Sequence, residues 1–135
     1  MSIQLSVAVR NGRLDSIETV VGTSAVLKLR TGAAPANVAA ADTGTVVATM
    51  TLPADWMAAA ASGSKALAGT WQDTSADAAG TVAHFRIYAS DGTTCHLQGT
   101  VTITGSGGDM TLDNNVLALA QSVSITSFTL TDGNA

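Results

Sequence analysis

The chain has 135 residues and a formal net charge of −4, from six basic and ten acidic residues. Only 12% of the residues are charged, with two His and one Cys, whereas most catalytic schemes use His, Cys, Lys or clustered carboxylates. The basic residues are scattered and form no stripe of the kind that binds nucleic acid. A single cysteine excludes an internal disulfide. This composition favours a protein that binds or holds something over an enzyme.

The length fits one domain over residues 1–135. The first residues lack the basic segment and the long apolar stretch of a signal peptide, and no apolar run approaches the ~20 residues of a membrane span. The mean hydropathy of +0.30 is high for a soluble monomer and comes largely from alanine. A surface of low charge, rich in Ala and Thr, predicts self-association or docking, although a domain that is merely rich in small residues would look the same.

Two periodicities follow one another at the N-terminus. Residues 3–9 alternate between apolar and polar side chains, which predicts a strand whose apolar face is formed by Ile3, Leu5, Val7 and Val9. Apolar residues then recur at helical spacing, and Gly22 can end a helix. We therefore expect a short amphipathic helix over 12–21 that packs against one end of a β core.

The segment 32–44 separates two predicted strands, 24–31 and 45–52. In the first strand, Lys28 and Arg30 are expected to face outward. The segment between the strands is too long for a hairpin turn and rich in small residues, so we expect a loop that crosses an edge or reaches a neighbouring molecule. The alanine- and glycine-rich stretch 61–80 suggests a second docking segment, or a plain solvated loop.

Trp56 is expected to plug the core from a single helical turn over 56–61. Weaker signals follow along the chain. They predict short strands over 66–72, 110–112, 116–119 and 123–131, the last with a bulge between Ile125 and Phe128.

The clearest element is a hairpin formed by 81–90 and 94–104. The inward-facing residues of both strands lie on the same face of the sheet only if the loop is Asp91-Gly92-Thr93. This loop pairs Ala89 with Cys95 and Ile87 with Leu97. In this register Arg86 lies opposite Gln98, Tyr88 opposite His96, and His84 opposite Thr100. The face carrying His84, Arg86 and Tyr88 is expected to be exposed.

About eight short strands, regularly spaced turn signals and one small helix predict an all-β fold. Our first choice is a jelly-roll-like, two-sheet β-sandwich with one short N-terminal helix.

Two combinations could carry chemistry on the hairpin. His84 and His96 could suggest a metal site, but they are not cross-strand partners and no carboxylate lies within two residues of either. Cys95 and His96 are adjacent on a strand and point to opposite faces, which argues against a nucleophile and base pair. We therefore assign no catalytic, cofactor-binding or metal-binding residues and expect no cofactor.

Two binding alternatives remain weak. Residues 107–114 resemble a single copy of a glycine–aspartate calcium repeat, in which a cation could be shared by Asp109, Asp113, Asn114 and Asn115. An ordinary Gly/Asp/Asn turn explains the same residues. For a sugar, the only plausible aromatic platform is Tyr88, beside His96 and Gln98.

Several stretches resemble a family of small structural proteins of tailed bacteriophages. The resemblance runs over most of the chain and is one of overall texture. The residues that carry it are 10–18 (RNGRLDSIE), 22–32 (GTSAVLKLRTG), 84–92 (HFRIYASDG) and 99–105 (GTVTITG). The resemblance is closest to head decoration, or cement, proteins of jelly-roll fold. It implies a virion protein on the capsid exterior, made in the host cytoplasm, that stabilises the lattice by bridging major capsid protein subunits.

The resemblance also implies a homodimer or homotrimer with no enzymatic role and no nucleic-acid or membrane partner. For docking we expect the N-terminal strand and the 32–44 loop to be used, the strand because a terminal strand can pair with a neighbour's edge. The alternatives are another virion role, in a tail, neck or fibre, and a glycan-binding module.

Overall fold

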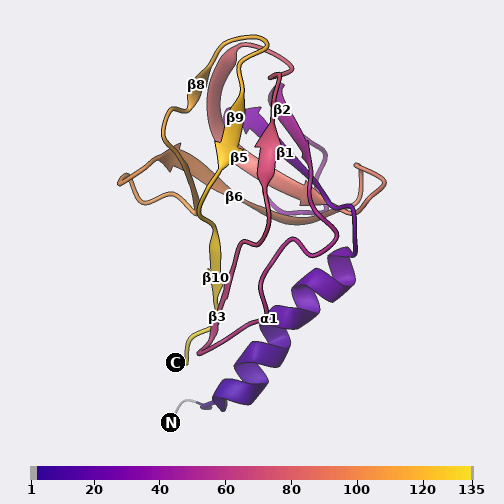
Figure 1. Cartoon of the computed structure of the whole chain (residues 1–135), viewed down its shortest axis with the longest axis vertical. Coiled ribbons are helices and arrows are strands. Elements are labelled where there is room, and N and C mark those ends of the chain that lie inside the picture. Colours follow the sequence, from indigo (N-terminus) through magenta and orange to yellow (C-terminus); the bar gives the residue numbers. More distant parts are fainter. Residues whose placement is uncertain (1–2, 135) are drawn as a thin grey trace.

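The computed structural model describes residues 3–134 and is mostly β, with one helix in that range (Figure 1). This confirms the β-rich class. The main sheet has the strand order β2-β1-β5-β6-β7, with β8 paired to β5, and two ribbons pair β10 with β3 and β4 with β9. The bounds are α1 Val7–Val21, β1 Val26–Thr31, β2 Val46–Thr51, β3 Ser64–Ala66, β4 Trp71–Asp73, β5 Gly80–Tyr88, β6 Cys95–Ile103, β7 Met110–Leu112, β8 Val116–Leu117, β9 Val123–Ile125 and β10 Thr129–Thr131.

Helix α1 begins earlier than its apolar spacing predicts, and the strand expected over 3–9 is wrong. Ser6 caps the helix, with its hydroxyl accepting from the Val9 N–H at 3.2 Å, so the chain turns helical where the alternation suggested a strand. The predicted end is confirmed: Gly22 lies at φ 87° and its N–H donates to the Glu18 carbonyl.

The predicted helical turn over 56–61 is also wrong. Met57 and Ala61 instead form β-bridges with Leu67 and Ser64, so this segment runs back along β3 as an irregular hairpin. Trp56 is nevertheless fully buried, as expected.

The final predicted strand, 123–131, is two strands. β9 pairs with β4 and β10 pairs with β3, and residues 126–128 carry the chain between the two ribbons. The slip in alternation therefore marks a change of partner and not a bulge. A single apolar pattern cannot reveal this change, because both strands bury alternate residues.

The core lies between the curled main sheet and the two ribbons. Four aromatic rings form a row through the core, in the spatial order Trp56, Trp71, Phe128 and Phe85. Successive ring centroids are 5.9, 5.7 and 5.5 Å apart. Each tryptophan N–H has a carbonyl partner, Gly22 for Trp56 and Trp56 for Trp71. The aromatic chain thus ties the end of α1 to the sheet.

The β5–β6 register matches the prediction from His84 to Ile87 and then shifts by one residue. His84 pairs with Thr100, Arg86 with Gln98 and Ile87 with Leu97, but Tyr88 pairs with Cys95. The irregularity between Ile87 and Tyr88 makes the predicted Tyr88–His96 and Ala89–Cys95 pairs wrong. It also leaves Cys95 on the side of Arg86 and Tyr88.

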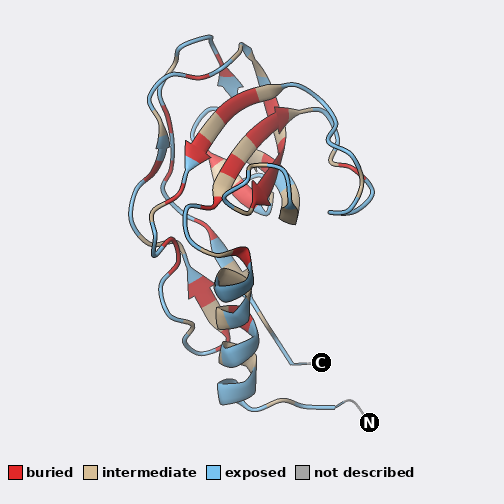
Figure 2. Cartoon of the chain, turned by 90° about the vertical axis from the view of Figure 1, so that its right-hand side faces the viewer, coloured by how far each residue is buried: buried red, intermediate tan, exposed pale blue. Residues whose placement is uncertain are grey.

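Helix α1 and the β3–β10 ribbon extend from one end of the main sheet, and both ends of the chain lie there (Figures 1 and 2). Asn134 joins the two ends by accepting from the Leu5 N–H at 2.8 Å and donating to the Leu5 carbonyl at 3.1 Å. Arg10 and Arg13 also contact Asp132, so the C-terminal residues pack along α1.

Candidate docking surface

The face of the sheet that was expected to be exposed is covered by residues 32–44, which we call the strap. Beneath it, Arg30 is 6% exposed, Arg86 is 1% exposed, and His84 and Tyr88 are fully buried. These polar side chains do face away from the apolar core, as their alternation predicts. What they face is a loop and not solvent.

Asp42 of the strap neutralises the buried arginines. Its carboxylate contacts Arg30 Nη2 at 2.7 Å and accepts from Arg86 and from the Tyr88 hydroxyl, the latter at 2.7 Å. Burial alone would raise the pKa of Asp42, but the hydrogen bonds from Tyr88 and Arg86 and the charges of both arginines hold it below its usual value. Burial and the bond to Asp42 raise the pKa of Tyr88 to about 12.

Strap carbonyls accept most of the remaining hydrogen bonds. Arg86 donates to the Val38 carbonyl at 2.7 Å and the Ala40 carbonyl at 3.1 Å, and Gln98 donates to the Pro35 carbonyl at 2.7 Å. One ring nitrogen of His84 lies 2.7 Å from the Gly32 carbonyl. The unusual length of this loop is explained by the buried polar residues that it must satisfy.

The base of the strap is closed tightly. The Thr31 N–H donates to the Thr45 carbonyl at 3.0 Å. Gly44 lies at φ 70°, and a Cβ there would lie 1.9 Å from the Thr31 carbonyl oxygen. Only glycine fits this position without moving backbone, so the strap is a built part of the fold.

The structure does not assemble the small-molecule sites considered from sequence. His84 is buried under the strap, whereas His96 borders a hollow next to α1, so they share no site. The aromatic platform for a sugar is wrong, because Tyr88 is buried. Cys95 is half-buried, and burial raises the pKa of its thiol against the opposing influence of Arg86.

The residues of the calcium-like segment are engaged in local structure. Asp109 accepts from the N–H and the hydroxyl of Thr100, both at 2.9 Å, and Asn114 accepts from Val116. Asn115 donates to the Val82 carbonyl. Within residues 3–134, no group of three or more His, Cys, Asp and Glu residues is placed to hold a metal ion.

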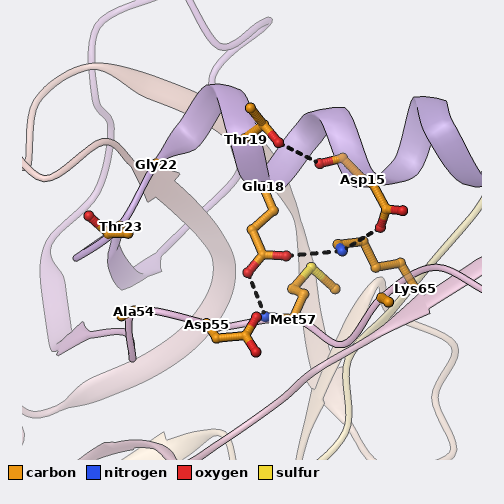
Figure 3. Close-up of a pocket in the computed structure, with 10 residues that line it drawn as sticks. Asp15, Glu18, Thr19, Gly22, Thr23, Ala54, Asp55, Met57 and Lys65 are labelled. Atoms are coloured by element: carbon orange, nitrogen blue, oxygen red, sulfur yellow. Dashed lines mark hydrogen bonds and ion pairs between the residues drawn. The ribbon is translucent and has the colours of Figure 1, made fainter.

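A buried lysine that sequence reasoning missed fastens α1 to the ribbon (Figure 3). Lys65 is 2% exposed, and its ammonium lies 2.8 Å from Asp15, 3.0 Å from Glu18 and 2.9 Å from the Ala58 carbonyl. Burial lowers the pKa of Lys65, but the two carboxylates more than reverse this and leave it raised. Hydrogen bonds from Lys65 and the Ala60 N–H lower the pKa of Asp15. These groups border an open pocket of about 430 Å³.

Four large apolar side chains are exposed on α1 and on the segment before it. Ile3 is 85% exposed, Val9 49% and Val20 67%, with Val7 nearby at 46%. Leu14 and Val21 face the body instead. We call Ile3, Val7, Val9 and Val20 the N-terminal apolar surface. Ser6 caps the helix and Lys65 anchors it, and these four side chains remain about half exposed or more.

Comparisons of the chain with protein-family models, curated proteins and solved structures gave no match. In the part of the chain that the structure describes, α1 is too short and too polar to span a membrane.

Proposed function

We propose that this chain is a bacteriophage capsid decoration, or cement, protein. It binds the outer surface of the head and stabilises the lattice by bridging major capsid protein subunits. The observation that carries the proposal is the N-terminal apolar surface, four large apolar side chains that are exposed along α1 and just before it. We take this exposed apolar area as the contact surface.

The use of polar groups supports a structural role. Asp42 binds two arginines and a tyrosine, and Asp15 and Glu18 bind a lysine, so the most buried charged groups hold the fold together. A protein that resists mechanical load on a shell benefits from loops that are fastened in this manner.

Attachment to a lattice does not need a large contact. Many copies on one shell, or linked copies in a dimer or trimer, convert weak individual contacts into firm attachment. A surface of a few apolar residues on α1 suffices under these conditions.

The proposal includes a relation to jelly-roll cement proteins. A curled, mostly antiparallel sheet that closes over an aromatic core with two short ribbons is related to a two-sheet sandwich. We place the protein on the capsid exterior after synthesis in the bacterial cytoplasm, with the major capsid protein and its own copies as partners.

The test is binding of the purified chain to phage heads stripped of it, measured by co-sedimentation and imaged by cryo-electron microscopy with averaging. Val9→Asp is expected to weaken binding about tenfold or more, because it places a charge in an apolar contact. Ile103→Asp is the matched control, because Ile103 is 46% exposed and lies at the end of β6, away from α1.

Regular density at lattice two-folds or three-folds, lost in Val9→Asp and kept in Ile103→Asp, supports the proposal. Density only on tails would replace the head role with a tail, neck or fibre role. Equal binding by both variants would remove α1 from the contact. Retention on a glycan array would favour the glycan module, although the burial of Tyr88 removes the platform on which that alternative was based.

A further inference from the structure

A groove with an open strand edge runs beside α1, at the same end of the molecule as the N-terminal apolar surface. Three adjoining hollows of about 500, 280 and 220 Å³ share His96, Leu97, Ile17 and Thr131 among their linings. One side of the groove is α1, and the others are β6 and β10. Its floor includes apolar side chains from all three elements, among them Ile17, Leu97 and Leu130.

The outer edge of β10 is free to pair with another strand. The Leu67 N–H donates to the Phe128 carbonyl and the Asp132 N–H donates to the Gly63 carbonyl, which fixes the alternation of the β3–β10 ladder. Phe128, Leu130 and Asp132 therefore turn their peptide groups toward β3. Thr129 and Thr131 turn theirs the other way, and among the strands in residues 3–134 β10 pairs with β3 alone.

The chain also carries a segment suited to this edge. Residues 3–6, the arm, are uncharged and alternate between apolar and polar side chains. They form no strand in their own molecule, and Ile3 is the most exposed of the large apolar residues that the structure describes. Asn134 holds the arm at Leu5, and Ile3 and Gln4 before it are exposed.

We infer that two copies of this chain associate by exchanging arms, each placing its arm along β10 of the other with Ile3 in the groove. The neutral arm matches a groove in which Arg13 and Asp132 already neutralise one another at 3.2 Å and in which Asp109 accepts hydrogen bonds from Thr100. The peptide groups of Ile3, which the bonds of Leu5 to Asn134 leave free, meet those of Thr131, and Ile3 covers Ile17, Leu97 and Leu130. This inference rests on the proposed function and deepens it: it assigns the self-association expected of a cement protein to the arm, with Ile3 in the groove, and leaves Val7, Val9 and Val20 for the capsid.

The test is the oligomeric state of the full chain by sedimentation equilibrium across a concentration series. Wild type is expected to self-associate, and Ile3→Asp to dissociate about tenfold or more readily. Leu119→Asp is the control: Leu119 is 67% exposed and lies outside the groove, so association is expected to be unchanged. Ile3 is 85% exposed, so its substitution leaves the core intact.

A second measurement identifies the contact. In a Cys95→Ser background, Ile3→Cys and Thr131→Cys are placed in separate chains and oxidised together. A disulfide between the two chains is expected, and none when Leu119→Cys replaces Thr131→Cys.

The inference and the proposed function fail separately. A wild-type chain that is monomeric at all concentrations, or an Ile3→Asp chain that associates normally, overturns arm exchange even if both bind heads. If the protein is monomeric and Ile3→Asp no longer binds heads, arm exchange is also overturned, because the arm then contacts the shell and not a second copy. Arm-linked oligomers that ignore heads would leave the inference standing and remove the cement role.

Discussion

At the scale of single residues, Asp42 binds three buried side chains. One carboxylate serves two guanidinium groups, one of them 1% exposed, and a buried tyrosine hydroxyl. Breaking a buried ion pair by removing one partner leaves the other charge uncompensated, which costs far more than the pair itself contributes. Asp42 therefore holds the strap against the sheet.

Replacing Asp42 by Asn keeps the size of the side chain and removes its charge. We expect Asp42→Asn to lower the free energy of unfolding by about 2 kcal/mol or more at neutral pH, a value reduced because the Asp42 side chain is 37% exposed. Urea denaturation monitored by tryptophan fluorescence measures it. Asp113→Asn, at an exposed aspartate, is the control and is expected to change little.

The pH dependence of this difference has a definite sign. Because the folded pKa of Asp42 is lowered from 3.8, its stabilisation is present above that value and is lost as the pH falls through the folded pKa. The gap between wild type and Asp42→Asn should therefore close in strong acid. A gap that stayed constant down to acid unfolding would contradict the ionic role of Asp42.

Residue patterns predicted which way these side chains point but not what they meet. The alternation along β5 correctly put His84, Arg86 and Tyr88 opposite the core. Alternation reports two faces and cannot distinguish a face covered by solvent from one covered by a polar loop. The composition of the strap gave one usable signal, a single carboxylate at Asp42 in a long, otherwise uncharged loop that follows the basic strand β1.

At the scale of elements, α1 is held by apolar burial and by Lys65. Leu14 and Val21 are the buried residues of the helix, and Lys65 binds two carboxylates one turn apart. The attachment of α1 to the ribbon therefore includes an ionic contact at a partly covered site (Figure 3).

Lys65→Met keeps the length of the side chain and removes its charge. We expect it to lower the free energy of unfolding by about 1–3 kcal/mol, because Glu18 then stays half-covered without a cation. Amide hydrogen exchange in α1 should quicken more than in β1 and β5. Arg13→Met is the control: its pair with Asp132 is exposed, so a change below about 1 kcal/mol is expected. Uniform quickening across the sheet would show that Lys65 does not act through α1.

The wrong prediction of a strand over residues 3–9 is explained by how α1 begins. An apolar residue at every second position from Ile3 to Val9 fits a strand, but the same residues fit the start of a helix once Ser6 caps it. Val7 and Val9 lie exposed on the finished helix, so burial gives no clue to the choice. The β5–β6 register was predictable up to Ile87 because both strands bury one face, and it failed where a local irregularity shifted it.

At the scale of the whole molecule, the basic side chains are bound within the chain. All six basic side chains have a partner in the chain: Arg10 and Arg13 contact Asp132, Lys28 donates to Gly92, Arg30 and Arg86 bind Asp42, and Lys65 binds Asp15 and Glu18. With a net charge of −4, the molecule has no cationic patch to offer an anionic partner. What it offers is the N-terminal apolar surface.

Attachment through that surface should therefore respond weakly to salt. Raising the salt from ~50 to ~500 mM shortens the range of electrostatic forces several-fold but leaves apolar burial intact. We expect the affinity for stripped heads, measured by co-sedimentation across this range, to change by less than about threefold in wild type. A steep fall with salt would assign docking to the acidic side chains instead. A steep rise would mean that repulsion between the shell and this acidic molecule opposes binding, and Val9→Asp would then show the same rise at lower overall affinity.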